Sequence, residues 1–212
     1  MIRNPFEFVR QHWFAKLVDA LRHGKSVLIS GDECSGKTIL ARLLAESAYL
    51  LDRTAVVQSV NDIDPCLIPP SWHNFELSQD CGLLALVKEI KNYGPGRIVV
   101  DEVRLDESKV LYGELLRMPG IFVIGQYPVL AWWKEFLQSL PERDAVASFG
   151  FIVELSRGSR DPTQYKPGFK ADIYAVSPVD AGIPSLAPIF PESLKDMPHK
   201  LDDCRCLTHS DP

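Results

Sequence analysis

The sequence lacks several features that would place it in a specialised class of protein. No apolar run approaches the ~20 residues of a membrane-spanning helix, and the first residues carry no signal-peptide core. The formal net charge of -5 leaves no positive excess for nucleic acid, so we predict no nucleic-acid partner. The five cysteines are an odd number and lie scattered, unlike a secreted disulfide scaffold. We therefore expect a cytoplasmic protein.

Composition favours one well-buried domain with short appendages. Of the 212 residues, 46% are hydrophobic and 24% are charged, which fits neither a disordered nor a fibrous chain. Apolar residues at helical steps predict an amphipathic helix within residues 1–24, capped by Asn4 and ended by Gly24. Clustered prolines predict an extended tail over residues 178–212. The domain proper would then span residues 25–177.

Strand-like and helix-like segments alternate within that domain. Strands are predicted at 26–30, 54–60, 97–102, 121–124, 151–155 and 171–176, and helices at 39–50, 83–93, 108–117 and around 132–137. Residues 62–78, which are rich in proline near their start, are predicted to form a loop. This alternation predicts an α/β fold of three layers with a mostly parallel central sheet.

The stretch Gly31-Asp32-Glu33-Cys34-Ser35-Gly36-Lys37-Thr38 matches G-x-x-x-x-G-K-[ST] between a predicted strand and a predicted helix. The glycines let consecutive N–H groups point into one concavity, and the helix N-terminus adds its positive dipole end. Lys37 would reach the β- and γ-phosphates of ATP, and the Thr38 hydroxyl would hold Mg²⁺. The predicted nucleotide contacts are Gly31, Cys34, Ser35, Gly36, Lys37, Thr38 and Ile39. The alternative is a chance match in a glycine-containing turn.

Two acids and a thiol inside this loop need separate interpretation. Asp32 and Glu33 would oppose a polyanion if they faced it, but the loop contacts phosphate through its backbone. We expect both side chains to face water and to weaken affinity only modestly. Cys34 is either a small spacer or a thiol activated by the helix N-terminus.

A second motif follows one strand-helix-strand unit later. The apolar strand 97–100 leads into Asp101, predicted to position Mg²⁺, and Glu102, predicted to activate the attacking water as general base. The alternative for Glu102 is a surface residue at the sheet edge. Gln126, after the next strand, is a candidate sensor of the γ-phosphate, and Arg104 a candidate contact to phosphate or to a neighbouring subunit. An ordinary surface role is the alternative for both.

With these motifs in place, residues 26–176 resemble the motor domain of the type II/type IV secretion ATPases, the ring motors of pili, conjugation and protein secretion. Residues 94–104 are similar to that family's R-x-x-P-D-R-I-x-x-G-E-x-R segment, with Glu102 and Arg104 matching position for position. The resemblance implies a RecA-like (ASCE) P-loop NTPase, a ring-shaped homo-oligomer, and partners in a membrane-associated machine.

Several family positions differ in this sequence. Asn61 stands where the family's Asp box has glutamate, Asn92 where it has an arginine, and Met118 and Gln126 where it has histidines. Because only one helix is predicted before the phosphate loop, we expect no counterpart of the family's separate N-terminal domain. The resemblance therefore implies either an ATPase subunit or an assembly protein that hydrolyses weakly or not at all. A generic P-loop ATPase and a small-molecule kinase are further alternatives. His199, Cys204, Cys206 and His209 are either zinc ligands or incidental residues of the tail.

Overall fold

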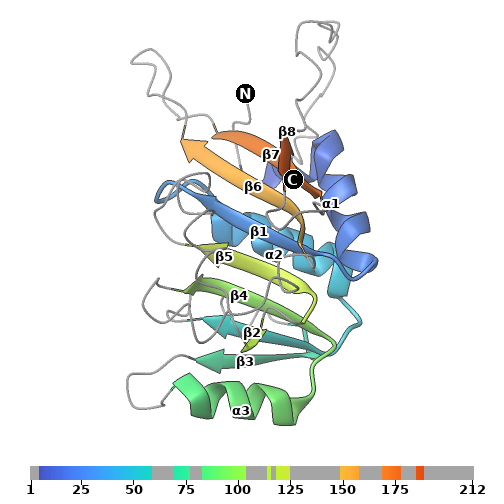
Figure 1. Ribbon diagram of the computed structural model, residues 1–212, viewed down its shortest axis with the longest axis vertical. Helices are drawn as coiled ribbons and strands as arrows, with labels where there is room; N and C mark the ends of the chain where they lie inside the picture. Colours follow the sequence, from blue (N-terminus) through green and yellow to red (C-terminus); the bar gives the residue numbers. More distant parts are fainter. Residues whose placement is uncertain are drawn as a thin grey trace, which may run out of the picture.

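The strands assemble into one mixed sheet (Figure 1). In this computed structural model the residues described are 5–58, 69–76, 83–103, 114–115, 118–124, 149–157, 169–177 and 185–188. Within them the strands are β1 (Ser26–Gly31), β2 (Thr54–Gln58), β3 (Trp72–Glu76), β4 (Arg97–Val103), β5 (Gly120–Ile124), β6 (Phe149–Arg157), β7 (Phe169–Ser177) and β8 (Ser185–Pro188). Their order across the sheet is β3-β2-β4-β5-β1-β6-β7-β8. From β3 to β6 neighbours pair in parallel, whereas β7 and β8 add antiparallel pairs.

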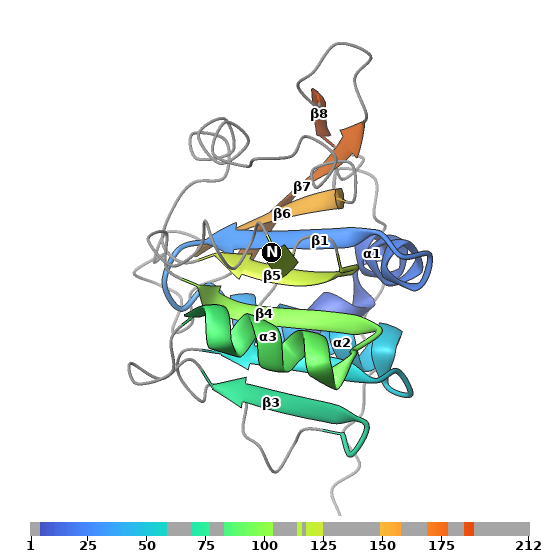
Figure 2. The same ribbon diagram turned by 60° about the horizontal axis from the view of Figure 1, so that its bottom comes forward.

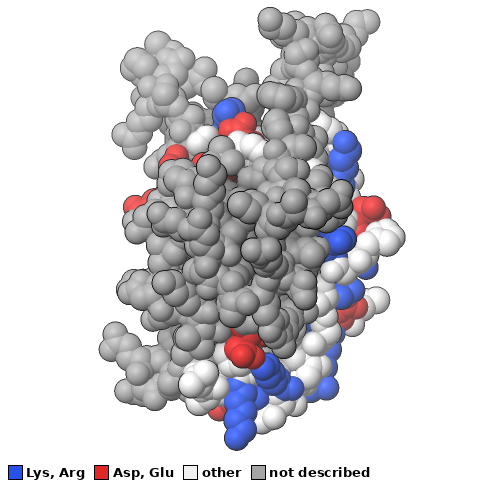
Figure 3. Space-filling model, viewed as in Figure 1, with Lys and Arg blue, Asp and Glu red and all other residues white. Residues whose placement is uncertain are grey.

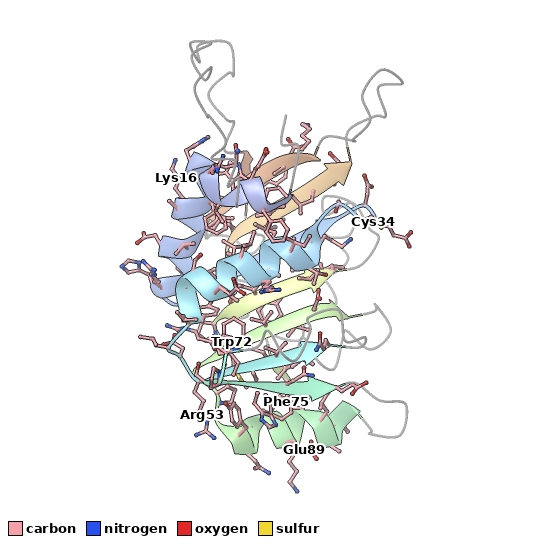
Figure 4. The ribbon with its side chains drawn as sticks, turned by 180° about the vertical axis from the view of Figure 1, so that it is seen from behind. Lys16, Cys34, Arg53, Trp72, Phe75 and Glu89 are labelled. Atoms are coloured by element: carbon pink, nitrogen blue, oxygen red, sulfur yellow. The ribbon has the colours of Figure 1, made fainter. Side chains whose placement is uncertain are left out.

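Helices cover both faces of this sheet (Figure 2). The helical segments are η1 (Pro5–Arg10), α1 (His12–Arg22), α2 (Lys37–Tyr49) and α3 (Leu83–Tyr93). Figure 2 shows α3 in front of the sheet and α2 behind it, and Figure 4 views the face covered by α1 and α2. The expected three-layer α/β fold with a mostly parallel sheet is confirmed.

Each central strand contributes side chains to both apolar layers, because successive side chains point to opposite faces of the sheet. On β1, Val27 and Ile29 lie in the cluster under α1 and α2, whereas Leu28 lies in the cluster on the α3 face. On β4, Val99 and Val100 divide in the same way. A parallel sheet that is covered on both faces explains why these strands read as continuous apolar runs in the sequence.

Three segments differ locally from the sequence prediction. The single helix expected within residues 1–24 is divided at Gln11, whose ψ of 136° is extended, into the 3-10 segment η1 and the helix α1. Asn4, the predicted cap, lies outside the described residues. Part of the predicted loop 62–78 forms the edge strand β3, and residues 185–188 of the predicted tail form β8 on the opposite edge. The helices predicted at 108–117 and 132–137 fall mostly or wholly outside the described residues.

Two ion pairs join charged residues near the end where the strands begin. Figure 3 shows Lys and Arg side chains along the right-hand edge of the view, with acidic side chains among them. Arg97 Nε lies 3.2 Å from Asp52 Oδ2, and Lys91 pairs with Glu114. None of the helices in the described ranges is long and apolar enough to cross a membrane.

Candidate functional site

The carboxyl ends of β1 and β5 lie side by side where the chain changes direction across the sheet. From β1 the chain leads to β2, on one side of it, whereas the next described strand after β5 is β6, on the other side of β1. In open α/β sheets, ligands bind beyond the carboxyl ends of strands at such a switch point. The loop predicted to hold phosphate leaves β1 at this place.

The loop after β1 turns tightly because Gly31 lies against the neighbouring strand. Its φ is +139°, and a Cβ there would lie 1.8 Å from the carbonyl oxygen of Leu155 on β6. That carbonyl accepts a hydrogen bond from the Asp32 N–H at 3.1 Å, and the Ser35 N–H closes a turn onto the Asp32 carbonyl at 3.2 Å. Only glycine at position 31 allows both this backbone conformation and this approach.

The N-terminus of α2 is open toward the loop. Gly36 precedes the helix with φ 90°, and no side-chain cap satisfies the first turn. The first N–H groups of any α-helix have no acceptor within the helix, and they carry its positive dipole end. The Ser35 hydroxyl is buried and has no hydrogen-bond partner among the described residues. Donors are therefore concentrated at this helix end, where an anion would be bound.

The two acids and the thiol of the loop, which could oppose a bound anion, have exposed side chains. Asp32, Glu33 and Cys34 are exposed, and Figure 4 shows Cys34 projecting from the end of the sheet opposite Arg53. Cys34 also has a φ of 55°, which is uncommon for a residue with a side chain. The two acids thus face water, as the sequence predicts, and the loop presents its backbone inward.

Lys37 folds back over the loop. Its side chain is buried, and Nζ donates to the Gly31 carbonyl at 3.1 Å and to the Asp32 carbonyl at 2.8 Å. Two carbonyls hold the ammonium without neutralising it, because neither carries a full negative charge. The cation therefore stays available to an anion beside the N-terminus of α2.

Thr38 connects the loop to the second motif. Its Oγ1 donates to Asp101 Oδ1 at 3.3 Å, across the 63 positions that separate them in sequence, and Asp101 is 1% exposed. A hydroxyl and a carboxylate are oxygen ligands of the kind that Mg²⁺ takes beside nucleotide phosphates, usually with only one or two carboxylates. Within the described ranges no group of three or more His, Cys, Asp or Glu side chains is placed to hold a metal. The pair thus fits Mg²⁺ bound together with phosphate.

A β-bulge lies in β4 beside Asp101. Val100 pairs with Phe122 of β5, but Val103 pairs with Ile124, so three steps along β4 match two along β5. Bulges are enriched next to active sites because they redirect side chains. The backbone of Glu102 lies within this bulge.

Other predicted residues are placed only in part. Ile39 is half-buried in α2, and Asn92 is exposed near the end of α3. Arg104, Gln126, Asn61 and the four tail residues considered as zinc ligands lie outside the described residues.

Sequence reasoning missed two polar residues on the α2 face of the sheet. Gln58 ends β2 and is fully buried, and its Nε2 donates to Asn74 Oδ1 of β3 at 3.0 Å. The signal was present: a glutamine closes the apolar strand 54–58, which pairs in parallel with the strand that carries Asp101. The contact between Gln58 and Asn74 could not be read from the sequence, because β3 was not recognised as a strand.

The fold has counterparts among solved structures. The VirB11 ATPase of the Brucella suis type IV secretion system, solved in complex with sulphate, has a TM-score of 0.61 at 15% identity, covering 80% of this chain and 53% of that one. The Legionella pneumophila ATPase DotB has a TM-score of 0.58 at 12% identity, covering 76% and 48%. The pilus retraction motor PilT with bound ADP has a TM-score of 0.58 at 13% identity, covering 77% of this chain and 51% of that one. At such identities the similarity shows the fold.

This chain spans about half the length of each of those three structures. No family model matches the sequence. No curated protein matches it either.

Proposed function

We propose that the chain binds ATP with Mg²⁺ at the loop after β1 and acts as an ATP-hydrolysing motor or switch subunit of a secretion, conjugation or pilus-type machine. The contact between Thr38 and Asp101 carries the proposal, because it brings together the two sequence motifs, one on α2 and one on β4. The buried Lys37 and the uncapped N-terminus of α2 supply the complementary charge. Similarity in fold to the ATPase of a type IV secretion system, to the ATPase DotB and to a pilus retraction motor supports the class of machine.

The residues divide between binding and turnover. Gly31, Cys34, Ser35, Gly36, Lys37, Thr38 and Ile39 surround the phosphates, chiefly through backbone N–H groups. Thr38 and Asp101 hold the metal, which would neutralise charge on the β- and γ-phosphates. Lys37 would also stabilise charge during turnover, and Glu102 would accept the proton of the attacking water. Gln126 would sense the γ-phosphate, and Arg104 would contact phosphate or a neighbouring subunit.

Replacing Lys37 by alanine tests the binding half of the proposal. We expect calorimetry to detect ATP binding to the unaltered protein and none to Lys37→Ala. Lys25→Ala is the matched control, since it removes the same charge from an exposed residue just before the other end of β1. Equal affinity of Lys37→Ala and the unaltered protein would reject the loop as the nucleotide site.

An assembly protein that binds nucleotide with weak or no hydrolysis is the second candidate. Met118 favours it, because this residue, where the resembling family has a histidine, packs against the apolar cluster on the α3 face. A steady-state ATPase assay of the unaltered protein beside Glu102→Gln separates the two. A rate that falls at least tenfold in the variant supports the motor, and equal rates support the assembly protein.

Two broader alternatives remain in the same assay series. A generic P-loop ATPase would hydrolyse ATP without any link to secretion, and a small-molecule kinase would transfer the phosphoryl group to an acceptor other than water. We propose a homo-oligomer, a hexameric ring in the motor case, located in the cytoplasm at the inner face of a membrane complex. Light scattering after size exclusion, with and without ATP, tests the assembly.

A further inference from the structure

A row of polar side chains crosses the α2 face of the sheet beside the candidate site. Alternation along each strand places Asp101 with Val99, Gln58 with Val56, and Asn74 with Trp72, and these three apolar residues belong to the cluster under α1 and α2. Thr38 meets Asp101 from above this face. The row therefore runs from α2 over β4 and β2 to the edge strand β3.

The register brings Gln58 next to Asp101. The two residues are partners in the parallel pair of β2 with β4, and neighbouring strands lie about 4.8 Å apart. Gln58 is fully buried and Asp101 is 1% exposed. A carboxylate this deep needs hydrogen-bond donors or a cation to offset its lost hydration. The side chain beside it is a neutral amide, which supplies donors and adds no like charge.

The amide of Gln58 is anchored from its other side. One N–H of Nε2 donates to Asn74 Oδ1 at 3.0 Å. A side-chain amide has two N–H donors, and this bond uses one of them. Asn74 comes from β3 and thereby holds the Gln58 side chain between two strands.

We propose that Gln58 is a positioning residue for the metal site: held by Asn74, its amide donates to Asp101 and orients that carboxylate toward Thr38. The inference rests on the proposed Mg²⁺-nucleotide function and extends it by two residues that touch neither nucleotide nor metal. Groups that orient a metal ligand typically change metal affinity by about 10- to 100-fold when they are removed.

The test compares nucleotide binding with and without the metal. Affinity for a fluorescent ATP analogue is measured in EDTA and in a Mg²⁺ titration, for the unaltered protein and for Gln58→Leu. In EDTA, we expect the affinity of Gln58→Leu for the ATP analogue to stay within about twofold of that of the unaltered protein. In the titration, the variant should need about 10- to 100-fold more Mg²⁺ to reach the same enhancement of this affinity. Loss of packing alone would not separate these two readouts.

Thr54→Val is the matched control. Thr54 lies at the other end of β2, is also buried, and loses one hydrogen bond, that to the Asp52 carbonyl, when its hydroxyl is replaced. We expect Thr54→Val to lose stability as Gln58→Leu does, and to need the same amount of Mg²⁺ as the unaltered protein. If Gln58→Leu does not fold, the half-buried Asn74 provides the test: Asn74→Val removes the anchor, whereas Asn74→Asp keeps an acceptor for Gln58.

The outcomes distinguish this inference from the function on which it rests. The inference is supported if Gln58→Leu or Asn74→Val needs more Mg²⁺ than the unaltered protein to reach the same enhancement of affinity, while Asn74→Asp needs no more. An unchanged Mg²⁺ dependence in Gln58→Leu, or in Asn74→Val if the first variant does not fold, overturns it and leaves the proposed function intact. Absence of nucleotide binding by the unaltered protein, in EDTA and in Mg²⁺ alike, overturns the proposed function and the inference with it.

Discussion

Replacing Gly31 by alanine is expected to destabilise the domain strongly, because β1 and β6 leave no room for a side chain there. The added Cβ would lie 1.8 Å from the Leu155 carbonyl oxygen, and real Cβ contacts essentially never fall below 3.0 Å. The two backbones would have to separate by about 1.2 Å, the difference between these distances. That shift would break the hydrogen bond from the Asp32 N–H to Leu155.

The separate costs can be added from the structure. The lost backbone hydrogen bond contributes about 1 kcal/mol. A φ of +139° for a residue with a Cβ costs about 1 to 3 kcal/mol more. With the loosened packing between the strands, we expect Gly31→Ala to lower the free energy of unfolding by about 3 to 5 kcal/mol, a large share of a typical 5 to 15 kcal/mol.

Urea unfolding followed by tryptophan fluorescence measures this loss, since Trp13 and Trp72 are 6% and 7% exposed. Gly94→Ala is the control: its φ is also positive, at +63°, but nothing lies within 4 Å of the added Cβ. It should cost only about 1 to 2 kcal/mol. A loss in Gly31→Ala no greater than in Gly94→Ala would refute the close approach of β6 to the loop.

Two further predictions concern buried hydroxyls. Burial raises the pKa of Tyr49, and its hydroxyl has no hydrogen-bond partner among the described residues. The folded state therefore keeps a proton that the unfolded state releases near pH 10, so stability is full below about pH 10 and falls by up to about 1.4 kcal/mol per pH unit above it. Tyr49→Phe should remove this slope while changing stability at neutral pH by less than about 1 kcal/mol, as urea unfolding on both sides of pH 10 would show; an unchanged alkaline slope would contradict it. On β1, the Ser26 hydroxyl accepts the buried Gly120 N–H at 3.1 Å, so Ser26→Ala should cost about 1 to 3 kcal/mol. Ser30→Ala, on the same strand, should cost less than about 0.5 kcal/mol because its hydroxyl has no partner in the described parts of the chain, and equal losses in a thermal melt would contradict the assignment.

The sequence predicts the fold best where local pattern and buried position agree. The strands through Val27, Val56, Val99 and Ile121 are apolar runs bounded by turn residues, and each lies in the sheet. Their pattern is strong because both faces of a parallel sheet are buried. The tight turn after β1 was predictable for a different reason: its glycines meet a backbone requirement that few other sequences satisfy.

The edges of the sheet were harder to predict. β3 contains only two buried residues, Trp72 and Phe75, so its pattern is weak and it follows a proline-rich stretch. Its place beside β2 depends on contacts made far along the chain. Gln58 was missed for the same reason, since its significance comes from lying next to Asp101 rather than from its neighbours in sequence.

β5 lies between β1, which leads into the predicted phosphate loop, and β4, which carries Asp101. It is buried along its whole length, and a Cβ at Gly120 would lie 2.2 Å from the Ile98 carbonyl oxygen of β4. Asp101 on β4 and the end of β1, from which the loop leads to Lys37 of α2, are thereby held by one stiff frame whose spacing the sheet itself maintains. A ligand that joins them cannot do mechanical work by stretching that frame.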